Sequence, residues 1–207
     1  MVGTKLGVEK TFWQKHGKSI LSLLGGFLLA YCGVQYYFHY VNKQALKASF
    51  IYDNMISHMQ KQDKKEALAE ANTLMQQYEK TPYARLAALL LAKLDIEQSN
   101  LEAAASHLRF AIQGEANAIQ QIAKVRLARV LAEQKNYQEA LDLLTPKTPM
   151  PAYTTLFEET KGDIYLMQKN KDKARLAYQN AIKAAPPDAP IARLQLKQAD
   201  LGVKEEP

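Results

Sequence analysis

The sequence predicts an all-α chain that begins with one membrane-spanning helix and continues as an array of stacked helix pairs. Residues 19–38 carry no formal charge, and related short motifs recur after residue 43 at intervals of 34 to 37 residues. Long runs rich in Ala, Leu, Glu, Gln and Lys favour helix, and no alternating segment typical of a β-strand occurs.

The uncharged stretch from residue 19 to 38 has the length of a membrane span, because 20 helical residues extend about 30 Å. It is longer than the apolar region of a cleaved signal, and no A-x-A site closes it. A lipid anchor on Cys32 is disfavoured, because Tyr31 stands where a small residue is required. Aromatic residues typical of a membrane–water boundary lie at both ends: Phe12, Trp13, Tyr36, Tyr37, Phe38 and Tyr40.

Lysines predict the orientation of this helix. Four precede it, Lys5, Lys10, Lys15 and Lys18, whereas only Lys43 and Lys47 follow it directly. The positive-inside rule then places the N-terminus in the cytoplasm. We therefore expect a cytoplasmic segment 1–18, a transmembrane helix 19–42 and a helical domain 43–207 on the opposite side of the membrane.

Small residues in the span, at spacings of 3, 4, 4 and 3, fall on one face of the helix: Ser19, Ser22, Gly26, Ala30 and Gly33. Such a face lets a second helix approach closely. Gly, Ala and Ser are also common in membrane helices, so composition alone is the alternative explanation. Ser22, Gly26, Ala30 and Gly33 are the candidate packing face, and membrane lipid surrounds the rest of residues 19–42.

Four related pentapeptides mark the repeat: DKKEA, NLEAA, NYQEA and NKDKA, which end at Ala67, Ala104, Ala140 and Ala174. A period near 34 residues is that of the tetratricopeptide repeat (TPR), in which two antiparallel helices cross at small residues. The last copy matches best, with Gly162, Tyr165, Ala174, Tyr178, Ala181 and Pro186 at the expected offsets. We expect about four degenerate TPR pairs, followed by a capping helix near residues 191–201.

The first helix of each TPR pair lines the concave face of the array, which commonly receives a segment of another protein. The offsets from the small residues place six charged side chains on this face: Lys93, Glu97, Arg129, Glu133, Glu159 and Asp163. They are the candidate partner groove. A solvated face with pairs four residues apart is the alternative for any one of them.

Other functional classes find no support in the sequence. The net charge of +6 is dispersed rather than gathered in a basic stripe, so nucleic-acid binding is not expected. His16, His39, His58 and His107 are scattered without a metal-ligand spacing. No P-loop, G-x-S-x-G or H-E-x-x-H motif occurs. We expect no cofactor, no metal and no enzymatic activity.

With these features in place, the chain resembles the YfgM family of bacterial inner-membrane proteins. The resemblance lies in FWQKHGK, GVQYYFHY, TPYARLAALLLAKL, KVRLARVLAEQKNYQEALDLL and KGDIYLMQKNKDKARLAYQNAI. It implies a non-enzymatic ancillary subunit of the Sec translocon, formed by SecY, SecE and SecG. It further implies a periplasmic TPR domain that links the channel exit to periplasmic chaperones, with the membrane-anchored chaperone PpiD as a partner. A TPR scaffold of another envelope complex, for secretion or division, and a substrate-holding chaperone are the alternatives.

Overall fold

The structure is a computed structural model that describes residues 3–114, 117–145 and 150–202, with side chains from residue 21 onward. These ranges hold helices and no strand, which confirms the predicted all-α fold. The chain divides into two units, Met1–Lys47 and Ala48–Pro207, and each is described by itself. In order, the elements are α1 (Gly3–Gln60), α2 (Lys64–Gln77), α3 (Pro82–Glu97), α4 (Leu101–Ala111), α5 (Ala118–Glu133), α6 (Tyr137–Leu143), η1 (Pro151–Tyr153), α7 (Thr154–Met167), α8 (Lys171–Ala184) and α9 (Ala192–Ala199).

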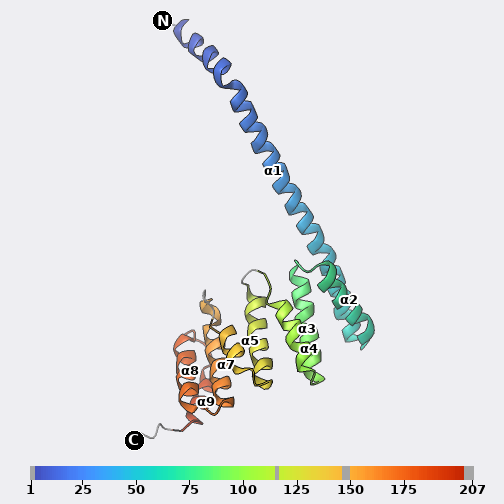
Figure 1. Ribbon diagram of the computed structural model, residues 1–207, viewed down its shortest axis with the longest axis vertical. Helices are drawn as coiled ribbons and strands as arrows, with labels where there is room; N and C mark the ends of the chain where they lie inside the picture. Colours follow the sequence, from blue (N-terminus) through green and yellow to red (C-terminus); the bar gives the residue numbers. More distant parts are fainter. Residues whose placement is uncertain (1–2, 115–116, 146–149, 203–207) are drawn as a thin grey trace. The chain divides into compact units, whose positions relative to one another are not determined.

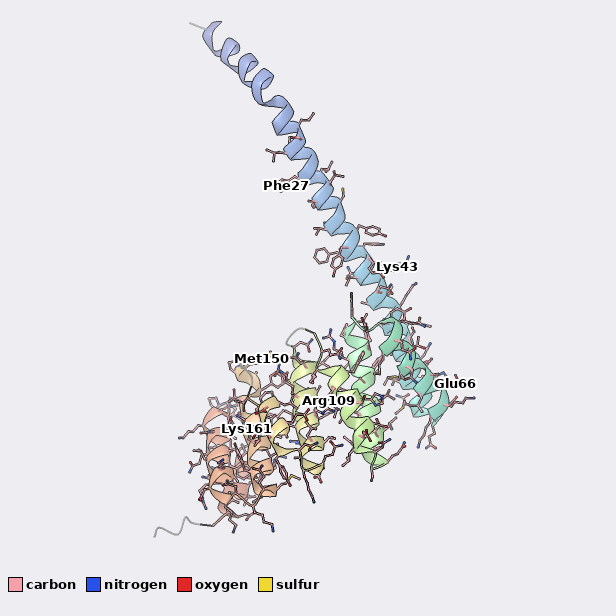
Figure 2. The ribbon with its side chains drawn as sticks, viewed as in Figure 1. Phe27, Lys43, Glu66, Arg109, Met150 and Lys161 are labelled. Carbon is pink, nitrogen blue, oxygen red and sulfur yellow. The ribbon has the colours of Figure 1, made fainter. Side chains whose placement is uncertain are left out.

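The first unit consists of the N-terminal part of α1. From Leu21 onward this helix is long and apolar enough to cross a membrane, by length and composition. Its large apolar side chains are exposed, as for Phe27, which is 79% accessible (Figure 2). The predicted boundary at residue 42 falls inside α1, because no Gly or Pro interrupts the sequence between Gly33 and Gln60.

The described residues of the second unit form an array of four helix pairs followed by one further helix. The C-terminal part of α1 packs with α2 around Ala48, Met55, Ala71 and Leu74. The next pairs are α3 with α4, α5 with α6, and α7 with α8, and α9 packs against α8 (Figure 1). The predicted order, four TPR pairs followed by a capping helix, is thus confirmed.

Small residues at the crossings allow the close approach of each pair. The clearest case is Gly162 on α7, where an added Cβ would overlap the ring of Tyr178 on α8. In the first pair Met55 stands at the equivalent position and is itself buried. The four alanines that close the pentapeptides all lie in the core: Ala67, Ala104, Ala140 and Ala174.

The turn inside each pair repeats one backbone conformation, which the sequence analysis did not anticipate. In all four turns a non-glycine residue adopts the left-handed conformation, with φ between 60° and 64°. The amide of the next residue donates to a carbonyl of the preceding helix, which is the Schellman ending of a helix. The left-handed residues are Gln62, Ser99, Lys135 and Lys169, and the N–H···O distances of the residues that follow are 2.9, 2.8, 2.8 and 2.9 Å.

Several sequence predictions lie outside the described residues. They concern the side chains of residues 1–20, which include the four N-terminal lysines and Ser19. Phe12, Trp13 and His16 lie in the same segment.

Candidate functional site

The described surface has a groove between α3 and α5, the first helices of the second and third pairs. Its volume is about 460 Å³. Apolar side chains form its floor, and among them Ile96 remains 41% accessible although it belongs to the folded array. Charged side chains form its rim. The lining residues are Ala92, Lys93, Ile96, Glu97, Leu101, Arg126, Arg129, Val130 and Glu133.

Four of the six predicted groove residues meet here, and their positive and negative charges follow the same order along both helices. Lys93 and Arg129 occupy equivalent positions 36 residues apart, as do Glu97 and Glu133. Because α4 reverses the chain between them, α3 and α5 run in the same direction. In each helix the cation therefore lies one turn before the carboxylate, and the two carboxylates are the last residues of α3 and α5.

The cationic side chains of the groove differ in their ion-pair and hydrogen-bond partners. Lys93 lies 3.7 Å from Glu97, which is a weak, exposed pair. Arg129 donates to the hydroxyl of Thr160 on α7 at 3.4 Å. Within the described part of the chain, neither Arg126 nor Arg129 has a carboxylate within 4 Å, so both guanidinium groups remain available to an acidic ligand.

The other two predicted groove residues, Glu159 and Asp163, are engaged inside the chain by α9. Glu159 is only 4% accessible and accepts from Arg193 at 3.0 Å and from Lys197 at 2.9 Å. Lys197 also donates to Asp163 at 2.6 Å. Among the described residues, the predicted groove is therefore open between α3 and α5, and side chains of α9 cover Glu159 and Asp163 on α7.

The same cluster includes Tyr178 on α8, whose hydroxyl donates to Asp163 at 2.8 Å. Burial raises the pKa of Tyr178 above its ordinary value, and the hydrogen bond to Asp163 and the negative charges of Asp163 and Glu159 raise it further. The hydroxyl therefore keeps its proton at neutral pH. It acts as a fixed donor that holds the Asp163 carboxylate toward α9.

Arg126, Ile96 and Leu101 line the groove but were not among the predicted residues, and the sequence held a signal for only two of them. Arg126 lies one helical turn before Arg129, and Ile96 lies between Lys93 and Glu97 on the same face of α3. Leu101 begins the next helix, so its side chain reaches the groove only because the turn after α3 is short. Helical spacing could have identified the first two.

The candidate packing face of α1 lies in the first unit. Ser22, Gly26 and Ala30 line a shallow recess together with Leu23 and Phe27. A Cβ added at Gly26 or Gly33 would meet no atom within 4 Å, so the surface there is open. The recess could accommodate a ridge of side chains from another helix.

The described residues show no grouping of three His, Cys, Asp or Glu side chains suited to a metal ion. His107 on α4 instead pairs with Asp95 on α3, with Nδ1 2.7 Å from the carboxylate. This contact joins the two helices of the second pair. The arrangement of the groove is suited to binding a chain segment, because an apolar floor with a charged rim provides both affinity and register.

Comparison with known proteins agrees with this architecture. A family model described as a tetratricopeptide repeat-like domain matches residues 10–203. A protein of Neisseria gonorrhoeae named ancillary SecYEG translocon subunit is 32% identical over 183 residues, which cover 87% of each chain. The chain belongs to this family of ancillary SecYEG translocon subunits. Proteins of the same name from Aggregatibacter actinomycetemcomitans and Escherichia coli are 28% and 25% identical over 86% and 94% of this chain, and over 86% and 93% of their own.

Membership confirms the resemblance to the YfgM family that the sequence motifs indicated. The similarity to the ancillary subunits reaches into α1 as well as the helix pairs, since the alignments cover 87% of the chain with the Neisseria protein and 94% with the Escherichia protein, and α1 alone has 58 residues. The apolar N-terminal helix fits anchoring in the inner membrane. The shared name describes a subunit of an assembly rather than a catalysed reaction.

Proposed function

We propose that this chain is a non-enzymatic ancillary subunit of the SecYEG translocon, anchored in the inner membrane by α1. Its N-terminus lies in the cytoplasm and its TPR domain, residues 43–207, lies in the periplasm. There it links the exit of the SecY, SecE and SecG channel to periplasmic chaperones, with PpiD as the partner. The observation that carries the proposal is the 32% identity, over 87% of both chains, to a protein named ancillary SecYEG translocon subunit.

The proposed orientation rests on the lysines that flank the apolar helix. Four precede it within residues 1–18, and two follow it directly, at Lys43 and Lys47. The excess of lysine on the N-terminal side favours a cytoplasmic N-terminus. The domain would then meet secreted proteins as they leave the channel.

Contact with the channel is assigned to the recess at Ser22, Gly26 and Ala30, with Gly33 extending the same face. In a lipid environment apolar side chains gain little by meeting one another, so close packing at small residues is what favours association. The groove between α3 and α5 is assigned to the chaperone side, because its residues Lys93, Glu97, Arg129 and Glu133 surround an apolar floor.

Co-purification from detergent-solubilised membranes tests the proposal. We expect SecY, SecE, SecG and PpiD to accompany the tagged full chain. The pair Gly26→Leu with Ala30→Leu should reduce the channel subunits recovered, because the added side chains fill the recess. The pair Leu24→Phe with Leu28→Phe, on the opposite face of α1, is the matched control and should have no effect.

A reporter that is active only outside the cytoplasm, fused after Pro207, tests the orientation independently. An active fusion and a protease-sensitive domain in spheroplasts are expected. An inactive, protected fusion would refute the periplasmic assignment. Recovery of another envelope complex in place of SecYEG would favour a scaffold for that complex instead.

A further inference from the structure

The groove between α3 and α5 carries information about the chemistry of its occupant, beyond its assignment as a partner site. Its floor is formed by Ala92, Ile96, Leu101 and Val130. Ala92 and Val130 are almost completely buried, whereas Ile96 is 41% accessible. An exposed isoleucine in the middle of a concave apolar floor indicates that an apolar side chain of the partner packs there.

The charges around this floor differ between its two ends. Lys93, Arg126 and Arg129 lie one to two turns before the ends of α3 and α5, and Glu97 and Glu133 are the last residues of these helices. Glu97 is partly neutralised by Lys93 at 3.7 Å. The two arginines have no carboxylate partner in the described ranges, and Arg129 has only the long contact of 3.4 Å to the Thr160 hydroxyl.

The spacing of the two arginines defines the ligand further. Arg126 and Arg129 are three residues apart on α5, so their side chains leave the same face one turn apart. A guanidinium group binds a carboxylate through two parallel hydrogen bonds, which requires a planar acidic group rather than a neutral amide. Two carboxylates separated by one helical turn match this pair of donors.

We propose that the α3–α5 groove binds a protein segment whose two ends differ in charge. The segment has Asp or Glu side chains one turn apart at one end and an apolar side chain at its centre. The carboxylates contact Arg126 and Arg129, and the apolar side chain packs on Ile96 and Leu101. The other end of the segment is neutral or basic, because it lies beside Glu97 and Glu133. The inference rests on the proposed function only in taking this groove as the partner-binding face.

A peptide-display selection against the full chain in nanodiscs of zwitterionic lipid identifies the preferred ligand directly. The library presents random twelve-residue segments, and a parallel selection uses the double variant Arg126→Gln with Arg129→Gln. We expect acidic residues three or four apart, beside Leu, Ile or Phe, to be enriched on the wild-type chain and not on the variant. No enrichment over the variant, or enrichment of segments without acidic residues, would overturn the proposal.

Binding of one selected peptide then measures the contribution of each part of the groove. Fluorescence anisotropy should show about a tenfold or greater loss of affinity for the double arginine variant and for the peptide with Gln in place of both acids. Higher salt should weaken binding of the acidic peptide more than that of its Gln form. Ile96→Ala should also reduce affinity. The matched control is Arg109→Gln, another exposed arginine, which lies on α4 (Figure 2). It pairs with Glu139 at 2.7 Å.

The outcome is separable from that of the proposed function. If acidic peptides bind through the arginines but SecYEG and PpiD do not co-purify, the chemistry of the groove stands and the named partners are wrong. If the partners co-purify equally with the wild type and with the double arginine variant, and no acidic peptide binds, the ancillary-subunit proposal stands and this inference is wrong.

Discussion

Replacing Lys135 by glycine should stabilise the third helix pair. Lys135 occupies the turn between α5 and α6 with φ at 64°, a left-handed conformation that costs a residue with a Cβ about 1 to 2 kcal/mol. Glycine avoids this cost but loses about 0.5 to 1 kcal/mol through the greater freedom of the unfolded chain. The exposed side chain has no ion pair in the described structure, so the net gain should be about 0.5 to 1 kcal/mol.

Hydrogen exchange of the full chain, followed by mass spectrometry, reports this gain locally. Amides of α5 and α6 should exchange about 2- to 5-fold more slowly in Lys135→Gly, since 1.4 kcal/mol corresponds to a factor of ten. The matched control is Lys93→Gly, the same substitution in the interior of α3, which should accelerate exchange there because glycine costs about 1 kcal/mol in a helix. Faster exchange of α5 and α6 in Lys135→Gly, with the control behaving as expected, would refute the reasoning about the turn.

Three further predictions concern the packing and capping of the array. Gly162→Ala should lower the free energy of unfolding by about 1 to 3 kcal/mol in urea denaturation, because the added methyl group overlaps the Tyr178 ring. Above pH 10 the wild type should lose stability faster than Tyr178→Phe, because the raised pKa keeps the proton on the folded hydroxyl while the unfolded chain releases it. Urea denaturation at pH 8 to 11 measures this difference. If the unfolding free energies of both proteins fell equally with pH, the prediction would be contradicted. Asn100→Ala should cost about 1 kcal/mol through loss of the cap to the Ala103 amide at 3.2 Å, whereas Asn136→Ala, whose side chain makes no capping bond, should change the unfolding free energy much less.

The cations of α9 provide another matched pair of substitutions. Lys197→Met should destabilise the chain by about 1 to 3 kcal/mol, because it leaves the buried Glu159 carboxylate and Asp163 with fewer cationic contacts. Arg193→Met should cost less than about 1 kcal/mol, since the Arg193 side chain is 73% accessible and solvent screens its charge. Thermal unfolding of both variants measures the difference, and equal effects would argue against the central position of Lys197.

Much of the fold could be predicted because it depends on local spacing. The recurrence of Ala67, Ala104, Ala140 and Ala174 reflects a requirement for small residues wherever two helices cross, and the structure buries all four. The left-handed turns were not predicted because glycine, the residue that usually marks such a turn in a sequence, is replaced here by Gln, Ser and Lys. The hydrogen bond from the next residue's amide and the packing of the adjoining helices hold these residues in a backbone conformation that non-glycine residues disfavour.

The candidate site could be predicted only in part. Helical offsets identified Lys93, Glu97, Arg129 and Glu133, which meet in one groove. The same offsets placed Glu159 and Asp163 on an open surface, and no local pattern could show that Arg193 and Lys197 cover them. That contact joins residues 34 to 38 apart, and it depends on how α9 returns over α7.

The sequence by itself determined the apolar helix, the helical repeat and its period, because each follows from the spacing of side chains along a single helix or between neighbouring helices. Only the tertiary structure decided which stretch of the concave face stays open. The reason is physical: the accessibility of a charged side chain depends on which cations approach it in space. Arg126 and Arg129 are open because no carboxylate of the described structure lies within 4 Å of them, whereas Glu159 is closed because α9 supplies its two cations.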